Sequence, residues 1–461
     1  TSSSCTTFVG RPHNPSALSG TTVPNILGTI SCSRNRIIDS DDENSEYLRT
    51  DTSSRNPDTT RIVNNDISCI TKSTCGFSAN VSIIPLIQKR PLSLEGFSSS
   101  QRCKIGNSLL PNVPSFVQQF SSKVFCGSFS KDGNFFITAT QDKWLYIYRT
   151  HEKGFNLYSQ MLARDVGWSV LDVAFSPDGN YFAYSSWADC LYQCHISGES
   201  LETLPLSPGV RRFCIFSLVF SNDGREIFGG ANDKCIYIYD RECQQRVLRF
   251  ESHDEDVNGI AFADDSSQVF YSVSDDGLCK VWDRRTINES NPRAVGVMAG
   301  HRDGITYVDS RGDKRYFITN SKDQSIKLWD IRMSCSNSAQ QNIRRFSHDW
   351  DYRWQPVPQR LWVPGMLEDD TSVMTYYGHS VRKTLIRCCF SPPNTTGQRF
   401  ICSGDSLGRV VIYDLLTGQV VRKMKGHAGC VRDISWHPYN HYIVTSSVSK
   451  IKLQSFYIEI C

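Results

Sequence analysis

The sequence lacks long apolar runs and lacks an excess of charge of either sign. No stretch approaches the ~20 consecutive apolar residues of a membrane-spanning helix, and no basic segment followed by an apolar run of the secretory type opens the chain at Thr1. Lys and Arg number 50 against 47 Asp and Glu, which leaves a formal charge of +3 over 461 residues. We therefore expect no membrane span and no direct contact with nucleic acid.

The sequence also lacks the common catalytic and metal-binding motifs. It has no Gly-rich phosphate loop with Lys, no Gly-x-Ser-x-Gly elbow and no His-Glu-x-x-His. The nearest approach to a metal cluster is Cys190, Cys194 and His195, which has no second ligand pair at zinc spacing and lies on alternating faces of a predicted strand. We expect no enzymatic activity, no cofactor and no bound metal.

Cysteine is present but diluted, with 18 residues spread over the chain. Several lie inside strand-like apolar runs, where a free thiol behaves as a small hydrophobic group. Examples are Cys214, Cys279, Cys388 and Cys402. Buried reduced thiols of this kind favour a reducing compartment, and we expect the protein in the nucleus and cytoplasm.

The first quarter of the chain has little that could form a core. Residues 1 to about 115 are rich in Ser, Thr, Asn and Pro, include the acidic stretch 39–46 and show no sustained apolar period. Such a segment cannot bury enough apolar surface to offset its ordering entropy. We predict that 1–115 is largely disordered, with apolar residues in 83–88 and 108–120 as exceptions that dock onto a folded body.

From residue 123 onward the sequence repeats. Apolar strands lead into tight turns at Phe129–Gly133, Phe175–Gly179 and Phe220–Gly224. Each unit closes on an aromatic residue followed by Asp, at Tyr239-Asp240, Trp282-Asp283, Trp329-Asp330 and Tyr413-Asp414. The steps between these pairs are 282 − 239 = 43, 329 − 282 = 47 and 413 − 329 = 84. A period in the forties with these markers is typical of WD-repeat propeller blades.

A third marker fixes the phase and the number of units. Gly-His pairs end at His301, His379 and His427, with Ser252-His253 in the same place. The His, an Asp in the turn before the closing strand (Asp276, Asp323) and the Trp are predicted to form a buried structural network. The units are 125–149, 168–196, 213–240, 253–283, 301–330, 379–414 and 427 onward. We predict an all-β, seven-bladed WD-repeat β-propeller over 123–461.

Two features depart from the repeat. Residues 333–375 carry no blade marker, and we interpret them as a long insertion, with a degenerate eighth blade as the alternative. The last unit lacks the turn Asp and closing Trp after Ser447. Because an unpaired sheet edge is unfavourable, the ring is expected to close there through an imperfect strand. The alternative is that the final residues belong to a variant end of the gene product.

A sequence feature that most of the units lack stands at the end of two neighbouring closing strands. Trp282–Arg285 and Trp329–Arg332 both read Trp-Asp-x-Arg, which places Arg285 and Arg332 on the same rim of adjacent blades. Arg is a planar, permanently charged fork that frequently anchors protein interfaces. We interpret the pair as a docking site for another protein. The alternative is that each Arg pairs with the Asp of its own blade.

The doubled Trp-Asp-x-Arg resembles the motif of WD-repeat substrate receptors of ubiquitin ligases built on a type-4 cullin. Segments 163–175, 229–233, 320–332, 349–354 and 384–387 strengthen this resemblance, whereas the N-terminal third matches poorly. The resemblance implies a non-catalytic receptor without a cofactor. It also implies that Asp283, Arg285, Asp330 and Arg332 contact the damaged-DNA-binding adaptor protein of the cullin complex. Such receptors are expected to use a segment before the propeller in adaptor docking as well.

A receptor also needs a surface that captures its protein substrate. Trp350, Tyr352, Arg353 and Trp354 combine residue types that are enriched in binding hot spots, on an insertion that the fold does not require. The alternative is that these aromatics pin the insertion to the propeller. Further candidates in blade-joining stretches are Arg164, Arg211 and Arg212, for which the alternative is a solvated or locally paired charge. The rival function is a WD-repeat scaffold of an unrelated assembly, such as an RNA-processing complex.

Overall fold

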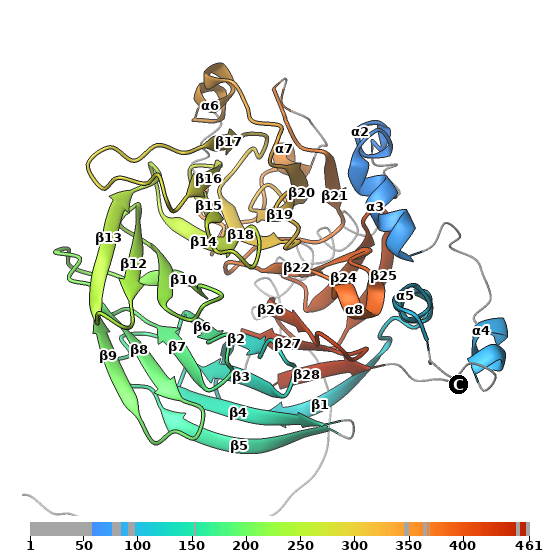
Figure 1. Ribbon diagram of the computed structural model, residues 1–461, viewed down its shortest axis with the longest axis horizontal. Coiled ribbons are helices and arrows are strands. Elements are labelled where there is room, and N and C mark those ends of the chain that lie inside the picture. The colour runs from blue at the N-terminus through green and yellow to red at the C-terminus, as the bar shows by residue number, and fades with distance from the viewer. Residues whose placement is uncertain are drawn as a thin grey trace, which may run out of the picture. The chain divides into compact units, whose positions relative to one another are not determined.

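The computed structural model describes residues 58–75, 84–90, 97–151, 154–344, 350–362, 367, 369–448 and 452–457. These residues form mainly antiparallel strands, with a few short helices (Figure 1). Among them, no helix is long and apolar enough to cross a membrane. Residues 1–57 lie outside the described part, so the prediction of disorder is not addressed for them.

Six four-stranded sheets are each built from consecutive strands, and we call them blades 1 to 6 in chain order. Blade 1 is β2 (Val124–Phe129), β3 (Phe135–Thr140), β4 (Trp144–His151) and β5 (Gly154–Leu162). Blade 2 is β6 (Asp172–Phe175), β7 (Tyr181–Ser185), β8 (Cys190–His195) and β9 (Leu201–Pro205). Blade 3 is β10 (Ile215–Phe220), β11 (Glu226–Ala231), β12 (Cys235–Asp240) and β13 (Gln245–Glu251).

Blade 4 is β14 (Val257–Phe262), β15 (Val269–Ser274), β16 (Cys279–Asp283) and β17 (Gly296–Met298). Blade 5 is β18 (Ile305–Ser310), β19 (Tyr316–Ser321), β20 (Ser325–Asp330) and β21 (Met374–Tyr377). Blade 6 is β22 (Cys388–Phe390), β23 (Phe400–Gly404), β24 (Arg409–Asp414) and β25 (Val420–Lys425). The first strand of each blade contacts the first strand of the next. This arrangement confirms the predicted WD-repeat propeller.

One further sheet closes the ring, and we call it the closing sheet. It contains β26 (Val431–Trp436), β27 (Ile443–Ser447) and β28 (Lys452–Tyr457), and its outer strand is β1 (Val113–Gln119) from the other end of the described chain. β1 pairs antiparallel with β28, and its register shifts between Phe116 and Gln118. β26 contacts β2 of blade 1. The imperfect last repeat therefore still forms a strand, and the predicted docking segment 108–120 supplies the edge that β28 needs.

The strand order places the connecting segments on two opposite rims. The turn from the first to the second strand of a blade and the connection from the third to the fourth lie on one rim, which we call the Asp-Arg rim because it carries Asp283, Arg285, Asp330 and Arg332. The turn from the second to the third strand and the loop that joins one blade to the next lie on the other, which we call the joining rim. A protein bound on one rim leaves the other accessible.

The prediction of disorder over 1–115 is wrong for several described segments. Residues within it form α2 (Thr60–Val63), α3 (Asp66–Cys75) and α5 (Ser99–Ser108), while α4 (Ile84–Lys89) overlaps the expected exception 83–88. α5 begins with a capping box between Ser98 and Gln101. Ile62 and Ile67 are 1% and 0% exposed in a core cluster with residues of blades 5 and 6. Ile84 of α4, in the other expected docking segment, stays 60% exposed.

The segment 333–375 is an insertion between the third and fourth strands of blade 5. Its described residues form α6 (Asn337–Arg344), α7 (Gln359–Trp362) and the start of β21, and they add no further sheet to the described propeller. The Cys335 amide donates to the Val297 carbonyl of β17, and Ile343 joins a buried cluster with Leu278. The insertion therefore runs along the outer edge of blade 4 and reaches the joining rim.

Candidate functional site

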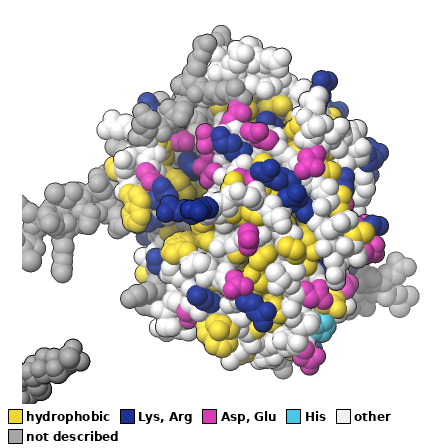
Figure 2. All heavy atoms as spheres, turned by 90° about the vertical axis from the view of Figure 1, so that its left-hand side faces the viewer, with side chains coloured by type: hydrophobic (Ala, Val, Ile, Leu, Met, Phe, Trp, Pro, Cys, Tyr) yellow, Lys and Arg dark blue, Asp and Glu magenta, His cyan; other side chains and the backbone are white. Residues whose placement is uncertain are grey.

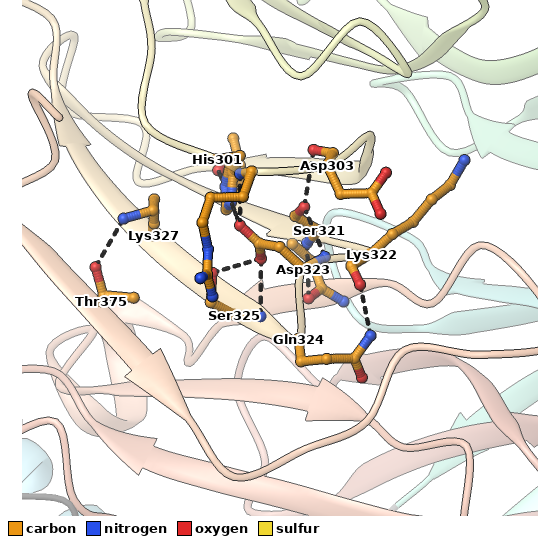
Figure 3. A network of polar contacts seen from close by, with 12 residues as sticks. His301, Asp303, Ser321, Lys322, Asp323, Gln324, Ser325, Lys327 and Thr375 are labelled. Carbon is orange, nitrogen blue, oxygen red and sulfur yellow. Dashed lines mark hydrogen bonds and ion pairs between the residues drawn. The ribbon is translucent and has the colours of Figure 1, made fainter. Parts of the chain in front are cut away.

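The His, Asp and Trp residues of blades 4 and 5 form the predicted structural networks. His301 Nδ1 lies 3.0 Å from Asp323 Oδ2 (Figure 3). Its Nε2 lies 2.7 Å from Thr319 Oγ1, which also accepts a hydrogen bond from Trp329. His253, Asp276, Ser272 and Trp282 repeat this arrangement in blade 4. Burial opposes ionisation of Asp276, but the His253 ring and backbone donors outweigh it and lower its pKa to about 2. These residues are structural.

Arg285 on the Asp-Arg rim pairs with the Asp of its own blade. Its Nη2 and Nε lie 2.7 and 2.9 Å from the two carboxylate oxygens of Asp283. These hydrogen bonds lower the pKa of Asp283 to about 2. The Arg285 side chain remains 67% exposed, and within the described chain its Nη1 has no acceptor. The pairing fixes the direction of the guanidinium fork and leaves donors on its outer side.

Arg332 has the same pairing in blade 5, with one addition. Its Nη2 lies 3.0 Å from Asp330 Oδ2 and 3.3 Å from Asp66 Oδ2 of α3. Asp330 is buried and also accepts from Arg315, which in turn lies 2.8 Å from Asp66. The side chain of Arg332 is 59% exposed. The two forks thus occupy equivalent places on adjacent blades, as the sequence predicts, and both use the internal pairing that was the alternative interpretation.

Sequence reasoning missed α2 and α3 as part of the Asp-Arg rim. Arg61 donates to the carbonyl oxygens of Asp370 and Ser372 at 2.6 and 3.0 Å, and Asn65 donates to Asp330 at 3.3 Å. The buried stripe of α3 at helical spacing is Ile67, Thr71 and Cys75. Only Ile67 in this stripe is strongly apolar, so the hydrophobic period that normally reveals a helix is faint.

The four candidate residues of the insertion lie on the joining rim. Two of them, Trp350 and Tyr352, contact the propeller, and the other two are exposed to solvent. Trp350 Nε1 donates to Asp303 Oδ2 at 2.7 Å, and Lys322 Nζ lies 4.3 Å from the centre of the Tyr352 ring. Figure 3 shows Asp303 and Lys322 beside the His301 network of blade 5. Arg353 pairs with Asp351 at 2.7 Å and is 60% exposed. Trp354 is 82% exposed, which is the highest exposure among the large apolar side chains of the described residues.

The other candidates also lie on the joining rim. Arg164 is in the loop between β5 and β6, and Arg211 and Arg212 are in the loop between β9 and β10. All three are exposed, and within the described ranges none forms an ion pair. The structure therefore gathers every predicted capture residue on the rim opposite Arg285 and Arg332, although on different blades.

A buried ion-pair cluster crosses the central channel and was not predicted. Arg387, just before β22, lies 2.7 Å from Asp172 of blade 2 and 3.1 Å from Asp433 of the closing sheet. The three side chains are 9%, 5% and 5% exposed. A cavity of about 590 Å³ on the Asp-Arg side is lined by these residues and by the first strands of the blades. Three sheets are thereby tied together across the channel.

The cysteines of the described residues are free thiols, and most are buried. Cys214, Cys279, Cys388 and Cys402 are buried as predicted. Burial raises the pKa of Cys214 above its ordinary range, so its thiol is protonated at neutral pH. No group of three His, Cys, Asp or Glu side chains in the part of the chain that the structure describes is placed to hold a metal ion.

Comparisons with known proteins identify the family. The WD domain, G-beta repeat family matches residues 114–149, 208–240, 244–283, 292–330 and 418–451. The LEC14B protein of Lithospermum erythrorhizon is 41% identical over 387 residues, which cover 80% of each chain. A DDB1- and CUL4-associated factor 11 homolog of Caenorhabditis elegans is 38% identical over 78% of this chain and 65% of its own length. The chain belongs to the WD-repeat family that includes these proteins.

Proposed function

We propose that this protein is a non-catalytic substrate receptor of a cullin-RING ubiquitin ligase. In this proposal the Asp-Arg rim docks onto the DDB1 adaptor of a CUL4 complex, and the joining rim holds the protein to be ubiquitylated. The observation that carries the proposal is the pair of exposed guanidinium forks, Arg285 and Arg332, at equivalent positions on adjacent blades. The name of the Caenorhabditis elegans relative, a DDB1- and CUL4-associated factor 11 homolog, supports the same partners.

The electrostatics of the Asp-Arg rim suit a protein partner. Each fork is already oriented by its own Asp, so little side-chain entropy is lost when it meets an acceptor on the adaptor. Asp66 of α3 provides a second carboxylate beside Arg332, whereas Asp283 is the one carboxylate paired with Arg285 among the described residues. The two forks are therefore expected to contribute unequally, with Arg285 the more available donor.

In this role the propeller itself catalyses no reaction. Its contribution is the effective concentration of a target lysine near the ubiquitin-loaded enzyme carried by the cullin complex. A rigid ring with binding surfaces on opposite rims suits this role, because the target is held while the adaptor remains engaged. The nucleus and cytoplasm are the compartments in which we propose that it acts.

The proposal is tested by affinity purification of the full chain from cells. We expect wild type to retain the DDB1 adaptor and CUL4, and Arg285→Ala combined with Arg332→Ala to lose both. Arg353→Ala is the matched control, because Arg353 makes the same fork with Asp351 but lies on the joining rim. This control is expected to retain the adaptor, and all variants to keep the wild-type Tm.

Two outcomes would contradict the proposal. If wild type retains neither the adaptor nor the cullin, the chain is a scaffold of another assembly, and an RNA-processing complex is the rival. If the double variant retains the adaptor as well as wild type does, the two forks are structural pairs and docking uses another surface.

A further inference from the structure

The chain contains three Ser-Pro dipeptides, and their serines differ in exposure. Ser176 and Ser391 are 1% and 0% exposed in first-to-second-strand turns of the Asp-Arg rim. Ser207, before Pro208, is exposed in the irregular loop 206–214 that joins blade 2 to blade 3. Ser207 has a φ of +48°, a left-handed conformation that is uncommon for a residue other than Gly. One Ser-Pro site is therefore accessible and two are not.

Three arginines lie in this loop or donate hydrogen bonds to it. Arg246 of β13 donates from Nη1 to the carbonyl oxygens of Leu206 and Ser207, at 2.8 and 3.0 Å. Arg211 and Arg212 follow in the same loop and are exposed. Across the described residues, none of these three arginines forms an ion pair with a carboxylate. Figure 2 looks onto the side of the ring that carries β9 and β13, where Lys and Arg side chains lie among Asp and Glu side chains.

Arg249, three residues after Arg246 on the same strand, provides a contrast. Its Nη2 lies 3.0 Å from Asp233, so its charge is already neutralised by a buried carboxylate. Arg246 instead has two backbone carbonyls as its acceptors among the residues that the structure describes. A carbonyl is a weaker partner for guanidinium than an anion, because an anion adds the attraction of two opposite charges to the hydrogen bond. Arg246 is thus placed beside Ser207 with its charge uncompensated.

We propose that Ser207 is a phosphorylation site and that its phosphate is held by Arg246, with Arg211 and Arg212 as further partners. A proline-directed protein kinase would supply the phosphoryl group from ATP. Ser207 Oγ forms a bond to the γ-phosphorus, the bond from that phosphorus to the bridging oxygen breaks, ADP leaves, and the hydroxyl proton passes to a carboxylate of the kinase. Phosphate opposite an arginine cluster orders the loop that carries it. This inference does not depend on adaptor binding.

The first experiment treats the full chain with a proline-directed kinase and Mg-ATP and maps the product by mass spectrometry. We expect one phosphoryl group, on Ser207, and none on Ser176 or Ser391. Ser207→Ala is expected to abolish the modification while keeping the wild-type Tm. Absence of phosphate on Ser207 in a folded protein would overturn the proposal.

The second experiment follows the titration of the attached phosphate by phosphorus NMR. Its second pKa, ordinarily about 6, is expected to fall to about 5 in wild type, because one charge-assisted hydrogen bond is equivalent to about one pKa unit. Arg246→Gln is expected to return it to about 6, and the matched variant Arg249→Gln to leave it lowered. An equal pKa in wild type and Arg246→Gln would overturn the assignment. Tight binding of a separate phosphoserine peptide by unmodified protein would overturn it too, in favour of capture of a phosphorylated partner.

Discussion

Replacing Arg387 tests whether the ion pairs across the channel hold the ring together. Arg387→Met keeps a long unbranched side chain but removes the charge that two carboxylates share, at 2.7 Å to Asp172 and 3.1 Å to Asp433. Removing one partner of a buried ion pair leaves uncompensated charge and costs about 3–5 kcal/mol of unfolding free energy. For a body of this size that corresponds to a fall in Tm of about 5 °C.

The reasoning also predicts a rescue and a pH dependence. Arg387→Met with Asp172→Asn and Asp433→Asn removes these three charges but leaves buried Arg432 with only the carbonyls of Phe125 and Leu171 as acceptors. This triple variant is therefore expected to recover part of the lost stability and to be more stable than the single variant. Burial already raises the pKa of Asp433, so its ionisation destabilises the folded state as the pH rises. Without Arg387 that pKa rises further, and the deficit of the single variant is expected to grow from acid to neutral pH.

Thermal and urea unfolding of the three proteins across this pH range measure these effects. A single variant as stable as wild type would show that water in the channel solvates the carboxylates. A triple variant no more stable than the single would show that the loss came from the shape of the Arg387 side chain, and either result would refute the electrostatic argument.

Two further predictions concern blade 4 and α3. Asp276→Asn is expected to cost about 2 kcal/mol at pH 7, because the lowered pKa of Asp276 contributes stability above its unfolded value of 3.8 that is lost as the pH falls toward 2. The gap between variant and wild type in urea unfolding should therefore close in acid. Ile67→Ala is expected to weaken the docking of α3 by about 2–4 kcal/mol, which would appear as faster amide exchange in α2 and α3. The control Ile70→Ala changes a side chain that is 40% exposed, and it is expected to change the docking free energy by less than about 0.5 kcal/mol. Equal exchange in both variants would contradict the packing described for α3.

The repeated parts of the propeller were predictable because each is encoded locally. Gly133, Gly179 and Gly224 end the predicted turns, and all three have φ between +71° and +75°, where Gly has no steric cost. The positions of Asp283, Arg285, Asp330 and Arg332 follow from the same repeats, since a residue just after a third strand must lie on one rim.

The rest depended on contacts between distant segments. Nothing near Arg387 in the sequence indicates that it meets Asp172, which is 215 residues away. α3 was missed because its buried stripe includes Thr71 and Cys75, and its anchors Asn65 and Asp66 find their partners in blade 5. Within the insertion, Trp350 contacts the propeller whereas Trp354 is exposed to solvent, and this difference likewise depends on the position of Asp303.

The pairing of β1 with β28 sets the order in which the molecule can be completed during its synthesis. The two strands are 452 − 119 = 333 residues apart, so at about 5–20 residues per second β28 leaves the ribosome roughly 17–67 s after β1. Throughout this interval β1 is an unpaired strand of the nascent chain, and its backbone groups can pair incorrectly with neighbouring polypeptides. Chaperone protection of β1 during translation should therefore influence the yield of folded protein more than protection of any blade formed from consecutive strands.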